Sequence, residues 1–191
     1  LQRSIQVVDK EIVKIINSLN STNRKVIALT NAWTGKYGKI NSLEDWRINE
    51  LKDLGYNFSN SFPKLPTKTF DDLKSKDSKR FPMYKSGILW TCNLSKEIVL
   101  SKFLEYSKFE PDMIIFIDDK EKHILSVKNF CKEGNIKFIG INYTGSNKFI
   151  DSLDKITASI QIYNLIHNKI WISSKDVIND DQIISPLKCM Q

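Results

Sequence analysis

The sequence predicts an α/β domain built around a parallel β-sheet. Short apolar runs, typical of buried parallel strands, alternate with segments whose apolar residues recur at helical spacing. This alternation favours strands joined by crossover helices. Three of the apolar runs also end in polar residues, and ligands of such sheets bind outside the carboxyl ends of the strands. The pattern therefore predicts both the fold class and the side of the sheet that carries function.

The first part of the chain is expected to contain two helices and one strand. Residues 7–20 place their aliphatic side chains on one helical stripe, and Asp9 lies where a carboxylate suits the helix dipole. Residues 25–29 form an apolar run that ends at Thr30 and Asn31, as a buried strand does. Residues 43–54 follow helical spacing, with Trp46 and Leu51 expected on the buried face.

Residues 57–86 are polar and carry Pro63, Pro66 and Pro82, so we expect a long excursion with little regular structure. This excursion is a candidate for a small lid. Three aromatic residues either face that lid or serve only in packing; they are Trp33, Tyr37 and Tyr84.

The second part of the chain repeats the strand-and-helix alternation. Strands are expected at residues 87–90, 113–117 and 137–141. Helices are expected at residues 96–107, 121–134 and 151–168. Ser95 is a candidate N-cap of the first of these helices, and Gly134 occupies a C-cap position after the second. The core domain is therefore expected to span residues 1–168, and residues 169–191 to form a C-terminal tail.

Composition and charge narrow the class of protein. The chain has 191 residues with 41% hydrophobic and 27% charged residues, which is ordinary for one soluble globular domain. The net charge is +7, but the basic residues are mostly lysines spread along the chain rather than clustered arginines, so a nucleic-acid surface is not favoured. No apolar stretch approaches the roughly 20 residues of a membrane span.

Three cysteines without paired spacing argue against a disulfide framework or a zinc site and favour a reducing compartment. We therefore expect a cytoplasmic location by default. The chain begins at Leu1 rather than at methionine, so a secretion signal upstream remains compatible with the sequence.

The acidic pair Asp118-Asp119 is the most informative feature. Two adjacent acids directly after five apolar residues repel each other in a partly buried place, and a hard divalent cation such as Mg²⁺ would relieve that cost. The alternative is a solvated turn, or an N-cap that Asp119 supplies to the helix at 121–134. The hydroxyl of Thr30 at another strand end could hold a phosphoryl oxygen. Lys96 at a helix start could balance phosphoryl charge, with Lys102 as the second candidate.

These features in order resemble motifs II, III and IV of the haloacid-dehalogenase-like (HAD) superfamily. The resemblance rests on the stretches at 26–31, 51–59, 85–90, 114–120 and 137–145 and covers about residues 5–160. It points to a bacterial HAD-like family of largely unknown function that is common among intracellular bacteria. The resemblance implies a Rossmannoid three-layer sandwich and the hydrolysis of a phosphorylated small molecule or phosphoprotein.

Residue by residue, the resemblance implies that Thr30 binds phosphate, that Lys96 is the motif III lysine and that Asn31 contacts substrate. It implies that Asp118 and Asp119 are the motif IV acids that hold Mg²⁺. Motif I, an apolar strand followed by Asp-x-Asp that supplies the nucleophile, is absent from this chain. The closest imitation, residues 7–11, leads directly into the first expected helix.

In HAD proteins the motif I strand lies centrally in the sheet, between the strands that match 25–29 and 113–117. Its loss would leave backbone groups unpaired at a cost of about 1–3 kcal/mol each. We therefore expect the strand to come from upstream residues of the same polypeptide, from another chain, or from a different strand that fills the gap. The chain alone is expected to be inactive. The alternative is a degenerate HAD-like binding module or effector fragment without catalysis.

Overall fold

The fold is mixed α/β, as the computed structural model of the chain shows for residues 7–22, 24–74, 80–145, 155–168, 170 and 172. Contacts divide the chain into two compact units after Tyr143. The first contains every element from α1 to β6, and the second contains α6 (Lys155–His167). The predicted core boundary at residue 168 stays a prediction, and most of the tail at 169–191 lies outside the described residues.

The strands of the first unit form two separate sheets. One has four strands in the order β1-β4-β3-β2, made of β1 (Ala28–Thr30), β4 (Ile88–Trp90), β3 (Met83–Lys85) and β2 (Lys68–Thr69). Its β1 and β4 are parallel, and its other two pairings are antiparallel. The second sheet pairs β5 (Met113–Asp118) with β6 (Lys137–Asn142) in parallel. Among the described strands, none joins β1 to β5.

Backbone directions identify the open edges of the two sheets. Ala28 and Thr30 both bond to the segment that contains β4. The N–H of Ala28 donates to the carbonyl of Gly87 at 3.0 Å, and the carbonyl of Thr30 accepts from the N–H of Thr91 at 2.9 Å. The peptide groups of Leu29 between them therefore face away from β4. In β5, the carbonyls of Asp112 and Asp118 accept from β6, so residues 113, 115 and 117 direct their backbone groups to the opposite edge.

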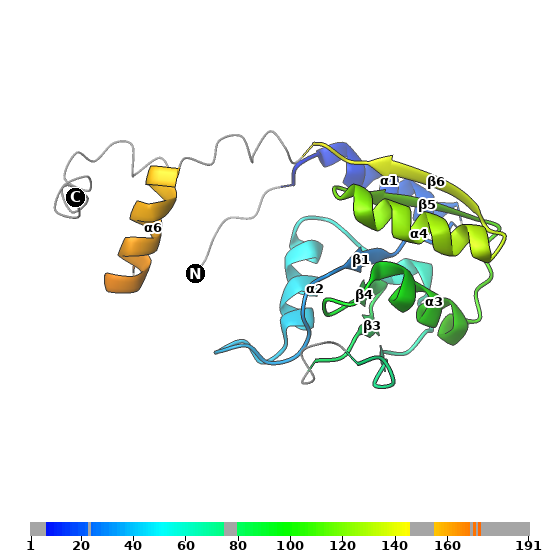
Figure 1. Cartoon of the computed structure of the whole chain (residues 1–191), viewed down its shortest axis with the longest axis horizontal. Helices are drawn as coiled ribbons and strands as arrows, with labels where there is room; N and C mark the ends of the chain where they lie inside the picture. The colour runs from blue at the N-terminus through cyan, green and yellow to red at the C-terminus, as the bar shows by residue number, and fades with distance from the viewer. Residues whose placement is uncertain are drawn as a thin grey trace. The chain divides into compact units, whose positions relative to one another are not determined.

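Helices lie against both faces of the first sheet and against one face of the second: Ile48 of α2 (Leu43–Asp53) packs against Ile88 and Trp90, on the face away from Leu89. Figure 1 shows α4 (Glu121–Glu133) lying along β5 and β6, with α3 (Lys96–Ser107) beside β1 and β4, and both helices contact those strands. The buried core between them is built mainly from large apolar side chains, including Phe70, Tyr84, Leu89, Val99, Phe103, Phe116 and Val127. Tyr84, a lid-facing candidate, is thus a core residue.

The other face of β5 and β6 remains exposed in the first unit. Five aliphatic side chains there are between 44% and 58% exposed: Met113, Ile115, Ile117, Ile139 and Ile141. The register sets Ile115 opposite Ile139 and Ile117 opposite Ile141, so these side chains form one continuous patch. Parallel sheets normally have both faces covered, and this face lacks that cover among the described residues of its unit.

The remaining helices of the unit differ in detail from expectation. α1 (Lys10–Ser21) begins after Asp9, whose side chain accepts from the N–H of Glu11 and caps the helix. In α2 (Leu43–Asp53) the buried residues are Glu44 and Ile48, while Trp46 is 42% exposed, so its predicted burial was wrong. The buried side of the helix instead carries Glu44 and Ile48, four residues apart, and Glu44 accepts from the N–H of Gly35 at 2.7 Å.

The excursion at 57–86 has more regular structure than expected. Within it lie a 3-10 turn, η1 (Ser59–Ser61), and the strands β2 and β3, which extend the first sheet. Residues 75–79 of the excursion lie outside the described residues. Because β3 is a sheet strand whose Tyr84 is buried, this part of the excursion contributes to the core.

Candidate functional site

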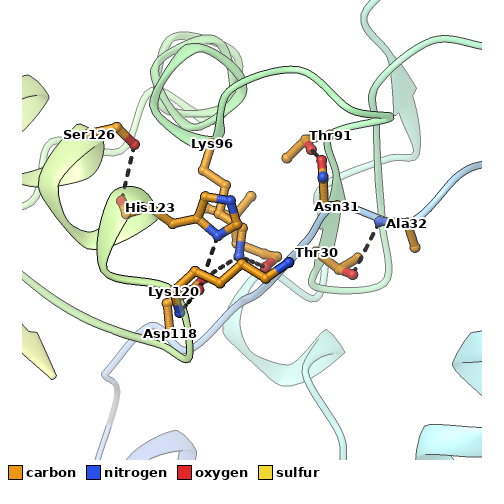
Figure 2. A network of polar contacts seen from close by, with 10 residues as sticks. Thr30, Asn31, Ala32, Thr91, Lys96, Asp118, Lys120, His123 and Ser126 are labelled. Atoms are coloured by element: carbon orange, nitrogen blue, oxygen red, sulfur yellow. Dashed lines mark hydrogen bonds and ion pairs between the residues drawn. The ribbon is translucent and has the colours of Figure 1, made fainter. Parts of the chain in front are cut away.

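Lys96 brings the carboxyl ends of the two sheets together. It is the first residue of α3, and its side chain is only 9% exposed. Its Nζ donates to the carbonyl of Leu29 in β1 at 3.1 Å and forms an ion pair with Asp118 at the end of β5. One ammonium group therefore lies between strands that belong to different sheets (Figure 2).

The turn before α3 explains how Lys96 reaches this place. Cys92 and Asn93 both have left-handed backbone conformations, with φ of 49° and 67°. Such conformations cost energy in residues other than glycine. Cys92 is completely buried, and its thiol donates to the carbonyl of Phe81 at 3.2 Å, which anchors the turn. Ser95 stands at the N-cap position as predicted, but its side chain makes no capping hydrogen bond.

Asp118 is surrounded by hydrogen-bond donors. Its Oδ1 accepts from the backbone N–H of Lys120 at 2.9 Å and lies 3.0 Å from Nδ1 of His123, while its Oδ2 faces Lys96. Burial alone would raise the pKa of Asp118. The hydrogen bonds from Lys96 and Lys120, the charge of Lys96 and the contact with His123 outweigh that effect and hold the pKa below its ordinary value of 3.8. Asp118 is therefore ionised at neutral pH.

Thr30 and Asn31 lie at the end of β1, near Lys96 (Figure 2). The Thr30 hydroxyl accepts from the N–H of Ala32 at 3.3 Å, a long bond that leaves its own proton available to a ligand. Asn31 is exposed, and its side-chain carbonyl accepts from the buried Thr91 hydroxyl at 2.6 Å. Thr91 thus fixes the Asn31 amide so that its NH₂ group is the part left to donate.

The second acid and the second lysine lie in different surroundings. Asp119 is exposed, and the N-cap position of α4 belongs to Lys120, so the alternative in which Asp119 caps that helix was wrong. Lys102 pairs with Asp72 at 2.9 Å and with Glu105 at 3.1 Å on the surface. These partners raise the pKa of Lys102. The charge of Lys102 is therefore paired on the surface, whereas Lys96 lies at the strand ends beside Leu29 and Asp118.

His123 is a member of this cluster that sequence reasoning missed. It lies in the first turn of α4, where its N–H donates to the carbonyl of Lys120 at 2.9 Å. The only sequence signal was a histidine five residues beyond the acid that ends the most apolar strand. That spacing spans a strand end, a bend and a helix start, so it does not by itself predict a contact.

Most of the chain matches one family of known sequences. DUF2608, described as a family of proteins of unknown function, matches residues 1–177.

The chain belongs to the DUF2608 family.

Relatives of this DUF2608 chain occur in rickettsiae. An uncharacterized protein of Rickettsia prowazekii, RP295, is 30% identical over 165 residues, which covers 84% of this chain and 53% of that protein. An uncharacterized protein of Rickettsia typhi, RT0286, is 29% identical over 159 residues and 82% of this chain. The chain thus spans about half the length of these relatives. No solved structure matches the chain significantly.

The donor set of the DUF2608 site suits a hard cation only in part. Carboxylate oxygens are the ligands that Mg²⁺ prefers, and Asp118 and Asp119 supply two such groups next to each other in the chain. Among the residues that the structure describes, no group of three or more acidic, histidine or cysteine side chains is placed to hold a metal. A metal at this site would therefore need further ligands, from water, substrate or additional protein.

In the described part of the chain, no helix has the length and apolar character to cross a membrane.

Proposed function

We propose that this DUF2608 chain forms most of the core of a Mg²⁺-dependent phosphomonoester hydrolase of the HAD type. The observation that carries the proposal is the position of Lys96, whose ammonium group joins the Asp118 carboxylate to the carboxyl end of β1. A buried cation and an ionised acid at the ends of two parallel pairs of strands suit the binding of a phosphoryl group and its counter-ion.

Each residue of the cluster has a role in this proposal. Two of the three N–H donors of Lys96 are used by Leu29 and Asp118, and the third donates to a phosphoryl oxygen. The Thr30 hydroxyl and the Asn31 amide donate to other oxygens of the same group. The substrate is a phosphorylated small molecule or a phosphoprotein, because the described residues supply donors for the phosphate and nothing specific for the remainder.

Asp118 and Asp119 are the residues that would hold Mg²⁺ in the complete protein. The ion would neutralise charge on the transferring phosphoryl group. Oδ2 of Asp118 accepts one hydrogen bond and retains a second lone pair for a ligand. Asp119 is exposed and has no hydrogen-bond partner within the described structure, so its carboxylate is available without breaking a contact.

Activity requires one further strand. In our proposal this strand lies in parallel between β1 and β5 and ends in the nucleophilic aspartate, which this chain lacks. The open edges support this placement, because the N–H of Leu29 faces away from β4, its carbonyl accepts from Lys96 rather than from a strand, and residues 113, 115 and 117 direct their backbone groups away from β6. The strand comes from upstream residues of the same polypeptide or from another chain. The relatives, about twice as long as the matched region, have room for it.

The test compares the whole polypeptide encoded by the gene with residues 1–191. Hydrolysis of p-nitrophenyl phosphate is followed with Mg²⁺ and with EDTA. We expect Mg²⁺-dependent turnover by the whole polypeptide and none by residues 1–191. In the whole polypeptide, Thr30→Val, Lys96→Met, Asp118→Asn and Asp119→Asn each lower kcat by about 100-fold or more.

Lys102→Met is the matched control, because it removes a lysine from the same helix whose partners lie on the surface. It should leave turnover unchanged, and thermal unfolding of every variant shows whether the fold is retained. Turnover by residues 1–191 that depends on Asp118, or equal losses from Lys102→Met and Lys96→Met in folded protein, would contradict the proposal.

A second candidate function is a HAD-like binding module without catalysis. The specific observation in its favour is that the Asp118 carboxylate already pairs with Lys96 and contacts His123, so protein groups compensate its charge without a metal. This alternative predicts that the folded whole polypeptide neither binds Mn²⁺ nor hydrolyses phosphate esters. Loss of Mg²⁺-dependent turnover on Asp118→Asn would exclude it.

A further inference from the structure

His123 contacts the oxygen of Asp118 that Lys96 does not, and the proposed function gives it no role. Its side chain is 18% exposed, and Nδ1 lies 3.0 Å from Oδ1 of Asp118. Since a carboxylate oxygen accepts hydrogen bonds, the contact is a hydrogen bond in the tautomer that carries a proton on Nδ1. In Figure 2 the His123 ring from α4 and the Lys96 side chain from α3 both point to this one carboxylate.

The backbone of α4 fixes the position of this ring. The His123 N–H donates to the carbonyl of Lys120 at 2.9 Å, and the His123 carbonyl accepts from the Ser126 hydroxyl at 3.0 Å. The residue is therefore held at both its peptide groups in the first turn of the helix. Its ring approaches Asp118 from a rigid element rather than from a loop.

A count of lone pairs shows what His123 does to Asp118. An ionised carboxylate offers about four acceptor positions, two on each oxygen. On Oδ1 both are taken, by the N–H of Lys120 and by His123. On Oδ2 one is taken by Lys96 and one remains. Without His123, Oδ1 would also have a free position, and the carboxylate would have one fewer restraint on its rotation.

We propose that His123 is a positioning residue. Its ring occupies the remaining acceptor position on Oδ1 of Asp118, so that Oδ2 is the only oxygen of this carboxylate left to bind the metal. The proposal rests on the proposed function, because it assigns the orientation of a carboxylate that holds the metal there. Residues that orient a metal ligand typically change metal affinity by about 10- to 100-fold when they are removed. His123 acts through Asp118 and does not touch the substrate.

The test measures Mn²⁺ binding by the whole polypeptide from the electron paramagnetic resonance signal of free Mn²⁺. His123→Ala should weaken Mn²⁺ binding by about tenfold. His123→Asn should restore most of that affinity, because the Asn side-chain nitrogen occupies nearly the same place as Nδ1 of histidine. The same variants are assayed for hydrolysis at increasing Mg²⁺, where His123→Ala should raise the Mg²⁺ concentration for half-maximal rate and leave kcat at saturating Mg²⁺ nearly unchanged.

The possible results separate this inference from the proposed function. If the wild-type polypeptide binds Mn²⁺ and hydrolyses phosphate esters but folded His123→Ala has unchanged or tighter Mn²⁺ binding, only the role of His123 is overturned. If His123→Asn binds as weakly as His123→Ala, the hydrogen bond from Nδ1 is not the cause and the inference also falls. If the wild-type polypeptide neither binds Mn²⁺ nor hydrolyses phosphate esters, both proposals fail together.

Discussion

At the residue scale, the buried pair of Lys96 and Asp118 dominates the site. Their side chains are 9% and 4% exposed, so each charge depends on the other for compensation. The sequence alone singled out both residues, because an acid directly after an apolar strand and a lysine at the start of the preceding helix both lie near the carboxyl ends of strands in an α/β fold. It did not predict that the pair would bind each other and Leu29, since that depends on side-chain conformations within a closed space.

Asp118→Asn in residues 1–191 is expected to lower the free energy of unfolding by about 3 kcal/mol at pH 7 in EDTA, because it leaves the buried ammonium of Lys96 uncompensated. The folded-state pKa of Asp118 is lowered, so the stabilisation is present above the ordinary pKa of 3.8 and is lost as the pH falls through the lower folded-state value. Urea unfolding at several pH values measures the difference between the two proteins. A difference that stays constant between pH 7 and pH 2 would contradict this prediction.

At the element scale, helices were easier to predict than strands. The expected helix at 96–107 matches α3, and the expected helix at 121–134 begins where α4 begins and ends one residue beyond it. In contrast, β2 and β3 were missed. Each has at most three residues, lies near a proline and is stabilised by pairing with a neighbouring strand rather than by a local pattern.

The turn between β3 and β4 allows a test at this scale. Gly87 has a φ of 77°, and a Cβ atom there would lie 2.0 Å from the backbone oxygen of Phe58. Gly87→Ala should therefore destabilise the chain by about 2 kcal/mol or more, from backbone strain and the clash together. Gly38→Ala is the matched control, because Gly38 has a φ of 56° but open space around it. Equal losses for the two variants in thermal unfolding would show that the contact with Phe58 is unimportant.

At the scale of the whole molecule, the two sheets and the exposed face of β5 and β6 are the main features. The mixed α/β class with a parallel sheet was predicted correctly from the alternation of strands and helices. The division of the strands into two sheets depends on pairing between distant segments, which local patterns do not determine. The HAD-like arrangement of the complete protein stays a prediction.

The exposed aliphatic patch predicts that residues 1–191 associate with one another as their concentration rises. Ile115→Lys places a charge in the middle of the patch and should reduce this association. Ile98→Lys is the control, since Ile98 is a similarly exposed isoleucine on α3, away from that sheet face. Sedimentation velocity over a range of concentrations measures the effect. Equal association of the two variants would show that the patch is not responsible.

The open edge of β5 also has a consequence for isotope exchange. Amide hydrogens of residues 114, 116 and 118 point to β6 and should exchange slowly with deuterium, whereas those of 113, 115 and 117 point outward and should exchange quickly. Neighbouring amides of one strand would then alternate between slow and fast rates. In the whole polypeptide this alternation should disappear if another strand lies against that edge, so nuclear magnetic resonance of six consecutive amides reports whether the sheet is complete.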